Sequence, residues 1–253
     1  MIINHLGEVR KNNQGTPMEI VGYRKKSDID VKFLDKFGYI KEHTLYINFK
    51  SGSIRNPYDI TVCGRGYLGV GYPTWENNKP TISYQTWQAM LRRCYDPNFT
   101  DIQPSYNGKC EVCEEWYNFQ TFAEWFYDNF YQVGTERMHV DKDILYKGNK
   151  IYCPEKCIIV PQRINMLFMH KPNKYGLPNG VKPSCNGKYE VSYNGKHIGT
   201  FSTIEEAAII HDKAKKVAIT EIANKYKNDI PTQLYDALIN WKPDYTDGFI
   251  WVN

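Results

Sequence analysis

The sequence predicts an α+β protein made of three small modules. Short alternating runs of β-branched and aromatic residues fill the first 75 positions, which is the pattern of antiparallel strands. Two apolar stripes with helical spacing lie between 83 and 131, and a strand, turn, strand and helix pattern fills 179–227. We therefore expect a small N-terminal β-barrel, a central ββα unit and a C-terminal three-stranded sheet with one helix.

Composition and charge are those of a folded protein with a basic C-terminal segment. The 253 residues are 42% apolar, which is enough for packed cores. The net charge of +4 is modest, but between positions 171 and 227 ten lysines face five acids. The 20 tyrosines and 6 tryptophans fit thin β-rich cores and nucleic-acid binders equally well.

Targeting signals and cysteines bear on the compartment. The first 30 residues lack the order of a signal peptide, and no apolar run approaches the ~20 residues of a membrane span. We therefore expect a soluble cytoplasmic protein with no membrane partner. Seven cysteines, an odd number, argue against a disulfide framework and leave metal binding or simple burial.

Residues 1–75 form the predicted β-rich accessory module. Alternation is clearest over 19–35 and 38–54, and a Gly-rich stretch follows that ends at Pro73. About five short strands of this kind pack most simply as a small antiparallel barrel.

Two helices are predicted after a polar linker at 76–80. The first covers 83–96, and Ser83 can cap its start. The second covers 119–131. Both apolar faces are expected to form core. The first face contains Trp87, Met90, Leu91 and Cys94, and the second contains Phe119, Phe122, Trp125, Phe126 and Phe130.

The stretch from His139 to Asn165 carries the candidate chemistry. Asp141 lies on a predicted strand, a turn at Gly148 and Asn149 follows, and Asn165 begins an apolar run 24 residues after Asp141. Carboxylate and amide oxygens are hard ligands that suit Mg²⁺, and this spacing suits one ion held between a β-ribbon and a helix. The alternatives are an exposed strand carboxylate and a helix cap.

Residues 82–168 resemble the HNH (ββα-metal, or His-Me finger) endonucleases of phages, and we expect the nuclease domain over 82–170. The resemblance rests on W-x-x-M-x-x-R-C-Y, on V-C-x-x-W-x-x-F-x-x-F, and on the V-D-K-D and Q-R-I-N segments of the candidate stretch. It implies Asp141 and Asn165 as ligands of Mg²⁺ or Mn²⁺, with Asn149 tying the ribbon together. Lys142 stands where the family has its catalytic His.

Several neighbouring residues are candidates for the proton transfer of such a reaction. Lys142 is a poor base unless burial lowers its pKa, and it can instead steady the scissile phosphate. His139 is either a base or an ordinary surface residue. On a strand His139, Asp141 and Asp143 would share one face, so Asp143 is a further metal ligand or a partner of His139. Arg163 is a phosphate contact or solvated surface.

Two cysteine pairs bracket the strand that bears Asp141. Cys110 and Cys113 have two residues between them, and Cys153 and Cys157 have three. The pairs resemble the structural zinc sites of some HNH nucleases, which implies a Zn²⁺ ion. Burial as apolar thiols is the alternative.

A second linker at 171–179 precedes the predicted C-terminal domain, 179–227. Ser202 or Thr203 can cap its helix. The segments G-K-Y, N-G-K and G-T-F-x-T-x-E-E-A-A resemble the Apetala/ERF-type DNA-binding domain. This implies duplex binding by the face of the sheet, with strong salt dependence. The residues expected nearest to DNA are Lys182, Lys188, Tyr193 and Lys196.

Together these resemblances imply a phage-type HNH endonuclease, of the homing or another mobile-element kind, that binds and cuts double-stranded DNA in the cytoplasm of a bacterial host. A DNA-binding regulator or accessory protein with a decayed nuclease site is the alternative, and a structural phage component is a third class. The module at 1–75 either positions the rest or contacts DNA. The tail at 228–253 has no predicted role, and no heptad indicates an oligomer.

Overall fold

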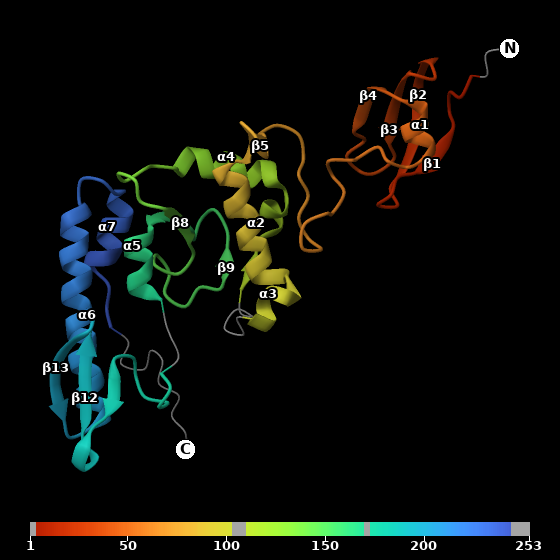
Figure 1. Cartoon of the computed structure of the whole chain (residues 1–253). Helices are drawn as coiled ribbons and strands as arrows, with labels where there is room; N and C mark the ends of the chain where they lie inside the picture. The colour runs from red at the N-terminus through yellow and green to blue at the C-terminus, as the bar shows by residue number, and fades with distance from the viewer. Residues whose placement is uncertain (1–3, 103–109, 170–172, 244–253) are drawn as a thin grey trace. The chain divides into compact units, whose positions relative to one another are not determined.

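The computed structural model describes residues 4–102, 110–169 and 173–243. It is a mixed α+β structure with several small sheets (Figure 1). The chain divides into two compact units, Met1–Asp128 with Ile151–Cys153, and Asn129–Lys150 with Pro154–Asn253. In the described ranges, no helix is both long enough and apolar enough to cross a bilayer.

The first unit begins with a four-stranded antiparallel sheet in the order β1-β2-β3-β4. The strands are Val9–Lys11, Pro17–Lys25, Asp28–Phe33 and Ile40–Thr44. Within the described residues β1 and β4 each pair with one neighbour, so the closed barrel expected from the sequence is not confirmed. The core of this sheet consists of Met18, Ile20, Ile29, Val31, Phe33, Phe49 and Ile54.

The strand expected over 38–54 is wrong in its second half. Tyr46–Lys50 is the helix α1, which ends before Gly52, whose φ is 72°. One helical turn brings Tyr46 and Phe49 to the same side, and both rings pack on the core of the sheet. Burial of the two rings therefore outweighs the alternating pattern.

The polar segment expected as a linker at 76–80 is part of a β-hairpin. Strand β5 (Trp75–Glu76) pairs with β6 (Lys79–Pro80). The turn between them is tight because Asn77 and Asn78 adopt φ values of 50° and 60°, which asparagine tolerates better than most residues.

Helices α2 (Ile82–Tyr95) and α4 (Phe119–Asn129) confirm the two predicted helices. Thr81 rather than Ser83 caps α2, since its hydroxyl oxygen accepts the Tyr84 N–H at 3.3 Å. The buried residues of the predicted faces are Trp87, Met90, Leu91, Cys94, Phe119, Phe122 and Phe126.

Between these helices lie α3 (Pro97–Ile102), β7 (Glu111–Val112) and a 3-10 turn at Glu114–Tyr117. Strand β7 pairs in parallel with β9 (Ile151–Tyr152). The first unit is thus built from two separate stretches of the chain.

The second unit contains a ββα element. Strand β8 (Met138–Asp141) pairs antiparallel with β10 (Ile158–Pro161), and the short helix α5 (Gln162–Asn165) follows β10 directly. A 3-10 turn at Met166–Phe168 comes next. The order of strand, strand and helix is the expected one, and the HNH assignment of this element stays a prediction.

The C-terminal sheet has the three predicted strands. Strands β11 (Val181–Pro183), β12 (Tyr189–Tyr193) and β13 (Lys196–Phe201) are antiparallel and lie in that order. Asn194 and Gly195 have φ values of 48° and 75° and form the predicted hairpin turn.

Helix α6 (Ile204–Tyr226) joins two cores of the second unit (Figure 1). Thr203 caps its start, and Ala207 packs on the C-terminal sheet. Its last turns pack on β10 and α5 through Ile219. Helix α7 (Thr232–Ile239), in the tail without a predicted role, closes this second core. The second core consists of Ile158, Val160, Ile164, Ile219, Ala223, Tyr226, Ile230, Leu234 and Leu238.

Candidate functional site

The fold brings Asn165 to His139, which lies two positions before Asp141 on β8. The pairing of β8 with β10 sets His139 opposite Val160 and Asp141 opposite Ile158. Helix α5 then places Nδ2 of Asn165 3.3 Å from Nδ1 of His139. His139 and Asp141 are two positions apart on β8 and therefore share a face of the strand. We call His139, Asp141 and Asn165 the β8–α5 corner.

Asp141 is a buried carboxylate, 8% exposed. Its Oδ1 accepts the N–H groups of Asp143 at 2.8 Å and Ile144 at 2.7 Å. Burial, followed by the charge of Asp143, raises the pKa of Asp141 to about 6. Both of these hydrogen bonds go to Oδ1, so Oδ2 is the oxygen that can bind a cation. A divalent ion there would offset the cost of burying the charge.

The hydrogen bond between Asn165 and His139 fixes the roles of both side chains. The amide nitrogen of Asn165 donates to Nδ1 of His139, so the carbonyl oxygen of Asn165 points elsewhere and can bind a cation. In this arrangement Nδ1 of His139 accepts a hydrogen bond, and its Nε2 is buried. His139 therefore positions Asn165, and acting as a base would require it to release that amide.

The expectation that His139, Asp141 and Asp143 share one strand face is wrong for Asp143. Strand β8 ends at Asp141, so Asp143 lies in the turn and not beside His139. Nζ of Lys142 lies 2.9 Å from a carboxylate oxygen of Asp143 and 3.1 Å from the carbonyl of Asn149. Nδ2 of Asn149 donates to the carbonyl of Lys142 at 2.7 Å. Lys142 and Asn149 thus tie this loop together, as the resemblance implies for Asn149.

The donors of the corner fit one hard divalent cation. A buried carboxylate oxygen from Asp141 and an amide oxygen from Asn165 match the preference of Mg²⁺ and Mn²⁺ for oxygen ligands. Such an ion keeps most of its coordination positions for water and phosphate. The structure gives Asp143 a different partner, since Lys142 pairs with it.

Arg163 lies on α5, next to the hydroxyl of Tyr226. The side chain of Arg163 is exposed, whereas Tyr226 is 4% exposed and donates a hydrogen bond to Glu136. Arg163 therefore sits at the surface where α6 meets α5, and its predicted contact with phosphate stays a prediction.

The candidate zinc ligands fall in both units. Cys110 and Cys113 flank β7 and Cys153 follows β9, so the parallel strand pair brings these three into one region of the first unit. Cys157 precedes β10 in the second unit. The Sγ atom of Cys94 lies 2.7 Å from that of Cys110. Sequence reasoning counted Cys94 only as core, because it belongs to the apolar face of α2. Zinc binding stays a prediction.

The C-terminal sheet packs on α6 through Val181 and Val191. Its opposite face, which we call the open face, carries an ion pair. Nζ of Lys182 lies 2.9 Å from Oε1 of Glu190, its cross-strand neighbour, and His197 approaches the same oxygen at 3.3 Å. The hydrogen bond from Lys182, together with a smaller effect of His197, lowers the pKa of Glu190. Glu190 therefore offsets part of the positive charge expected on this face.

The other predicted DNA contacts do not all lie on this face. Tyr193 packs against His211 of α6, with ring centroids 5.4 Å apart. Its hydroxyl is half-buried, which raises its pKa. Lys188, directly before β12, and Lys196, the first residue of β13, are both exposed. The residues best placed to meet phosphates are thus Lys188 and Lys196.

A separate group in the first unit can also hold a metal ion. Ligand atoms of Asp28, Asp30 and His43 all lie within 4.8 Å of one another. Arg24 donates to Asp28 at 2.7 Å and to Asp30 at 2.6 Å, so its guanidinium already balances both carboxylates. Sequence reasoning missed this group, although the alternation of Asp28 and Asp30 on one strand face was a readable signal.

Comparison with known proteins found no relative from which a function could be inferred. No protein-family model, no curated protein and no solved structure matches the chain.

Proposed function

We propose that this protein is a metal-dependent DNA endonuclease of the phage HNH type. The observation that carries the proposal is the β8–α5 corner, in which His139 lies two positions from a buried carboxylate on β8 and contacts the amide of Asn165 on the helix after β10. Asp141 and Asn165 would hold one Mg²⁺ or Mn²⁺ ion. When bound, the ion supplies a Lewis acid for the charge that develops on the phosphate and the leaving 3′ oxygen.

The residues of the corner contribute position and charge. Asp141 is held in place by two backbone N–H groups, so its carboxylate needs no rearrangement to bind a cation. His139 holds Asn165 through Nδ1. Lys142 is 14% exposed in its side chain and pairs with Asp143. Asp143 offsets part of that charge, so reaching a phosphate would require Lys142 to leave Asp143.

Helix α6 packs on both the ββα element and the C-terminal sheet, so it fixes the proposed nuclease site relative to the proposed DNA-binding sheet. Helix α6 packs on the sheet at Ala207 and on the ββα element at Ala223, which lie 16 positions apart on the helix. At 1.5 Å per residue these contacts are ~24 Å apart along one helix. The proposed cut would therefore fall at a constant distance from the position that the sheet contacts.

A DNA-binding regulator with a decayed nuclease site is the second candidate. Two observations favour it. Lys142 stands where the resemblance implies a catalytic His, and it is engaged by Asp143 and Asn149. The Nδ1 lone pair of His139 is engaged by Asn165. In this arrangement neither side chain accepts a proton from water.

Nicking of supercoiled plasmid tests the proposal. The purified full chain should convert supercoiled to nicked or linear DNA with Mg²⁺ or Mn²⁺ and not with a chelator. The Asp141→Ala variant should lose at least ~10³-fold in rate, because a Lewis-acid ion contributes several kcal/mol. Asp143→Ala is the matched control and should retain most of the rate. Salt-sensitive duplex binding without nicking in any divalent ion would support the second candidate instead.

A further inference from the structure

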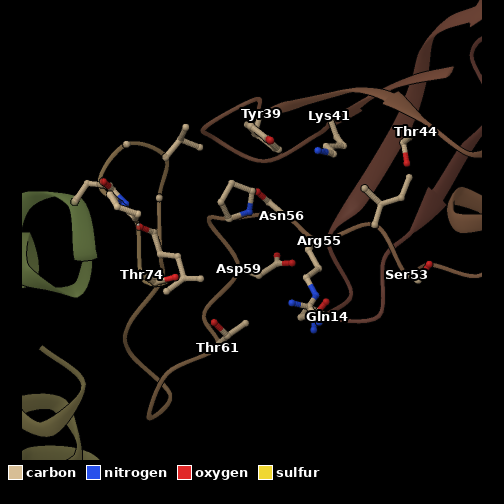
Figure 2. Close-up of a pocket in the computed structure, with 18 of the residues that line it drawn as sticks. Gln14, Tyr39, Lys41, Thr44, Ser53, Arg55, Asn56, Asp59, Thr61 and Thr74 are labelled. Carbon is tan, nitrogen blue, oxygen red and sulfur yellow. The ribbon is translucent and has the colours of Figure 1, made fainter. Parts of the chain in front are cut away.

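A hollow of about 870 Å³ opens in the first unit, and none of its lining residues belongs to the β8–α5 corner (Figure 2). One wall is the end of the N-terminal sheet, with Tyr39 and Lys41. The other is formed by the loops that follow α1, including Arg55 and Tyr72. This volume is within the range of pockets that bind small ligands or parts of larger ones.

Side-chain hydrogen bonds hold the walls of the hollow. Nδ2 of Asn56 donates to Asp35 at 2.6 Å, which fastens one loop to the sheet. Gln120 of α4 holds the other loop, since Nε2 donates to the carbonyl of Leu68 at 2.7 Å and Oε1 accepts the N–H of Tyr72. The hollow is therefore built into the fold and does not need a ligand to form.

The charges in the hollow favour an anion. Lys41 and Arg55 are exposed, and no ion pair among the described residues includes either of them. The acidic residue in the lining, Asp59, is 7% exposed and accepts hydrogen bonds from Asn12 and Thr16. The accessible charge of the hollow is thus positive.

The uncharged lining matches the chemistry of a polynucleotide strand. Ser53, Thr61 and Thr74 supply hydroxyl groups of the kind that contact phosphate and sugar. Tyr39 and Tyr72 supply rings. Tyr72 is 39% exposed, and one face of its ring stacks on Tyr127 with centroids 5.3 Å apart, which leaves the other face for a base. An aromatic ring near a positive groove is the usual arrangement for stacking unpaired bases. A duplex keeps its bases stacked inside and cannot present one to such a hollow.

We propose that this hollow binds single-stranded nucleic acid, with Lys41 and Arg55 on backbone phosphates and Tyr72 stacked on a base. The proposal goes beyond the endonuclease activity and does not depend on it. It gives the first unit a strand-binding role that differs in chemistry from duplex binding by the C-terminal sheet.

Fluorescence anisotropy with a labelled thymidine oligonucleotide of about 12 nucleotides tests the proposal. The full chain is used in chelator, so that no metal-dependent cleavage contributes. The double variant Lys41→Ala with Arg55→Ala should weaken binding about tenfold or more. It should also reduce the slope of log affinity against log salt by about 1.4, which is ~0.7 for each lost phosphate contact. Tyr72→Ala alone should weaken binding about tenfold.

A matched control separates the hollow from general attraction. Lys25→Ala with Lys50→Ala removes the same charge from exposed positions of the same module that do not line the hollow. This variant should change affinity less than twofold. Equal losses in both double variants, or no binding of the oligonucleotide by the unmodified chain, would overturn the proposal.

Two further arms identify the ligand. A uridine oligonucleotide that binds as well as the thymidine one, with the same dependence on Lys41 and Arg55, supports a site for either kind of strand. If free inorganic phosphate displaces the oligonucleotide at equal phosphate concentration, the hollow is an anion site and the proposal is wrong. The plasmid assay in the Lys41 and Arg55 variant keeps the two functions distinct, because nicking should survive there when single-strand binding is lost.

Discussion

The β8–α5 corner and the open face of the C-terminal sheet carry their charges in opposite ways. In the corner Asp141 is buried and fixed by backbone N–H groups. On the sheet Lys182 is exposed and pairs with Glu190. A fixed buried charge is costly to the fold and is suited to hold an ion, whereas exposed charges that pair with each other add little energy and are easily rearranged. The chemistry is therefore expected in the corner, and general attraction to DNA on the sheet.

A cavity in the core beneath α6 should affect both regions at once. Leu234 of α7 is fully buried in the core that α6 shares with β10 and α5. Leu234→Ala should lower the free energy of unfolding by ~2–5 kcal/mol, because it leaves a cavity in that core. Hydrogen exchange followed by mass spectrometry should show β8 and β12 losing protection together, since α6 joins them.

The control for this experiment lies on the same helix. Val217 of α6 is 57% exposed, so Val217→Ala should change stability by less than ~0.5 kcal/mol. If Leu234→Ala exposes β8 while β12 keeps its full protection, the corner and the sheet are independent bodies and a constant distance between them is excluded.

The buried charge of Asp141 should make the stability of the fold depend on pH. The pKa of Asp141 is raised in the folded chain to about 6, so the fold binds a proton more tightly than the unfolded chain does. In chelator, this group makes stability fall as pH rises from about 4 to above 6. Asp141→Asn keeps the acceptor oxygen and removes the charge. It should therefore be more stable than the natural chain at pH 7.5 by ~1–3 kcal/mol.

Denaturant unfolding of both chains as a function of pH measures the difference. The gap between Asp141→Asn and the natural chain should close below about pH 3, where the carboxyl is protonated in both states. Asp143→Asn should show a much smaller gap, because the side chain of Asp143 is 43% exposed and pairs with Lys142. A constant gap at every pH would mean that burial of the Asp141 charge is not its cause.

The smallest expected effect concerns the sheet. Glu190→Gln removes the partner of Lys182 and His197, so both become available for phosphates. Duplex affinity should rise by a few-fold, equivalent to less than ~1 kcal/mol. Glu205→Gln, in the first turn of α6, removes the same charge at an exposed position. An equal gain from Glu205→Gln would show that net charge matters and the ion pair does not.

Local sequence patterns predicted the elements whose determinants are close in the chain. The faces of α2 and α4 follow from apolar spacing alone. The hairpin between β12 and β13 follows from the turn at Asn194 and Gly195. These signals are local because each depends on a few neighbouring residues.

The features that sequence reasoning missed depend on distant partners. Helix α7 and the end of α6 are stabilised by β10 and α5, and their spacing alone could not name that partner. The single turn of α1 is decided by burial of Tyr46 and Phe49 on a sheet formed by other segments.

The candidate site was predicted in part for the same reason. The residue types of Asp141 and Asn165 pointed to oxygen ligands, and the strand register needed to bring Asn165 to His139 came only with the fold. The engagement of Lys142 by Asp143 and Asn149 depends on where β8 ends. The hollow of the first unit is lined by several segments that are distant in the sequence, so no single motif predicts it.

Direct measurement of Mn²⁺ binding by electron paramagnetic resonance tests the central claim, that Asp141 and Asn165 jointly hold one divalent cation. The natural chain should bind one tightly held ion, and Asp141→Asn or Asn165→Ala should weaken that binding by ~10–100-fold. Asp28→Ala, in the Arg24-balanced group of the first unit, should leave it unchanged. Binding that survives both substitutions in the corner, or that disappears with Asp28→Ala, would contradict the account.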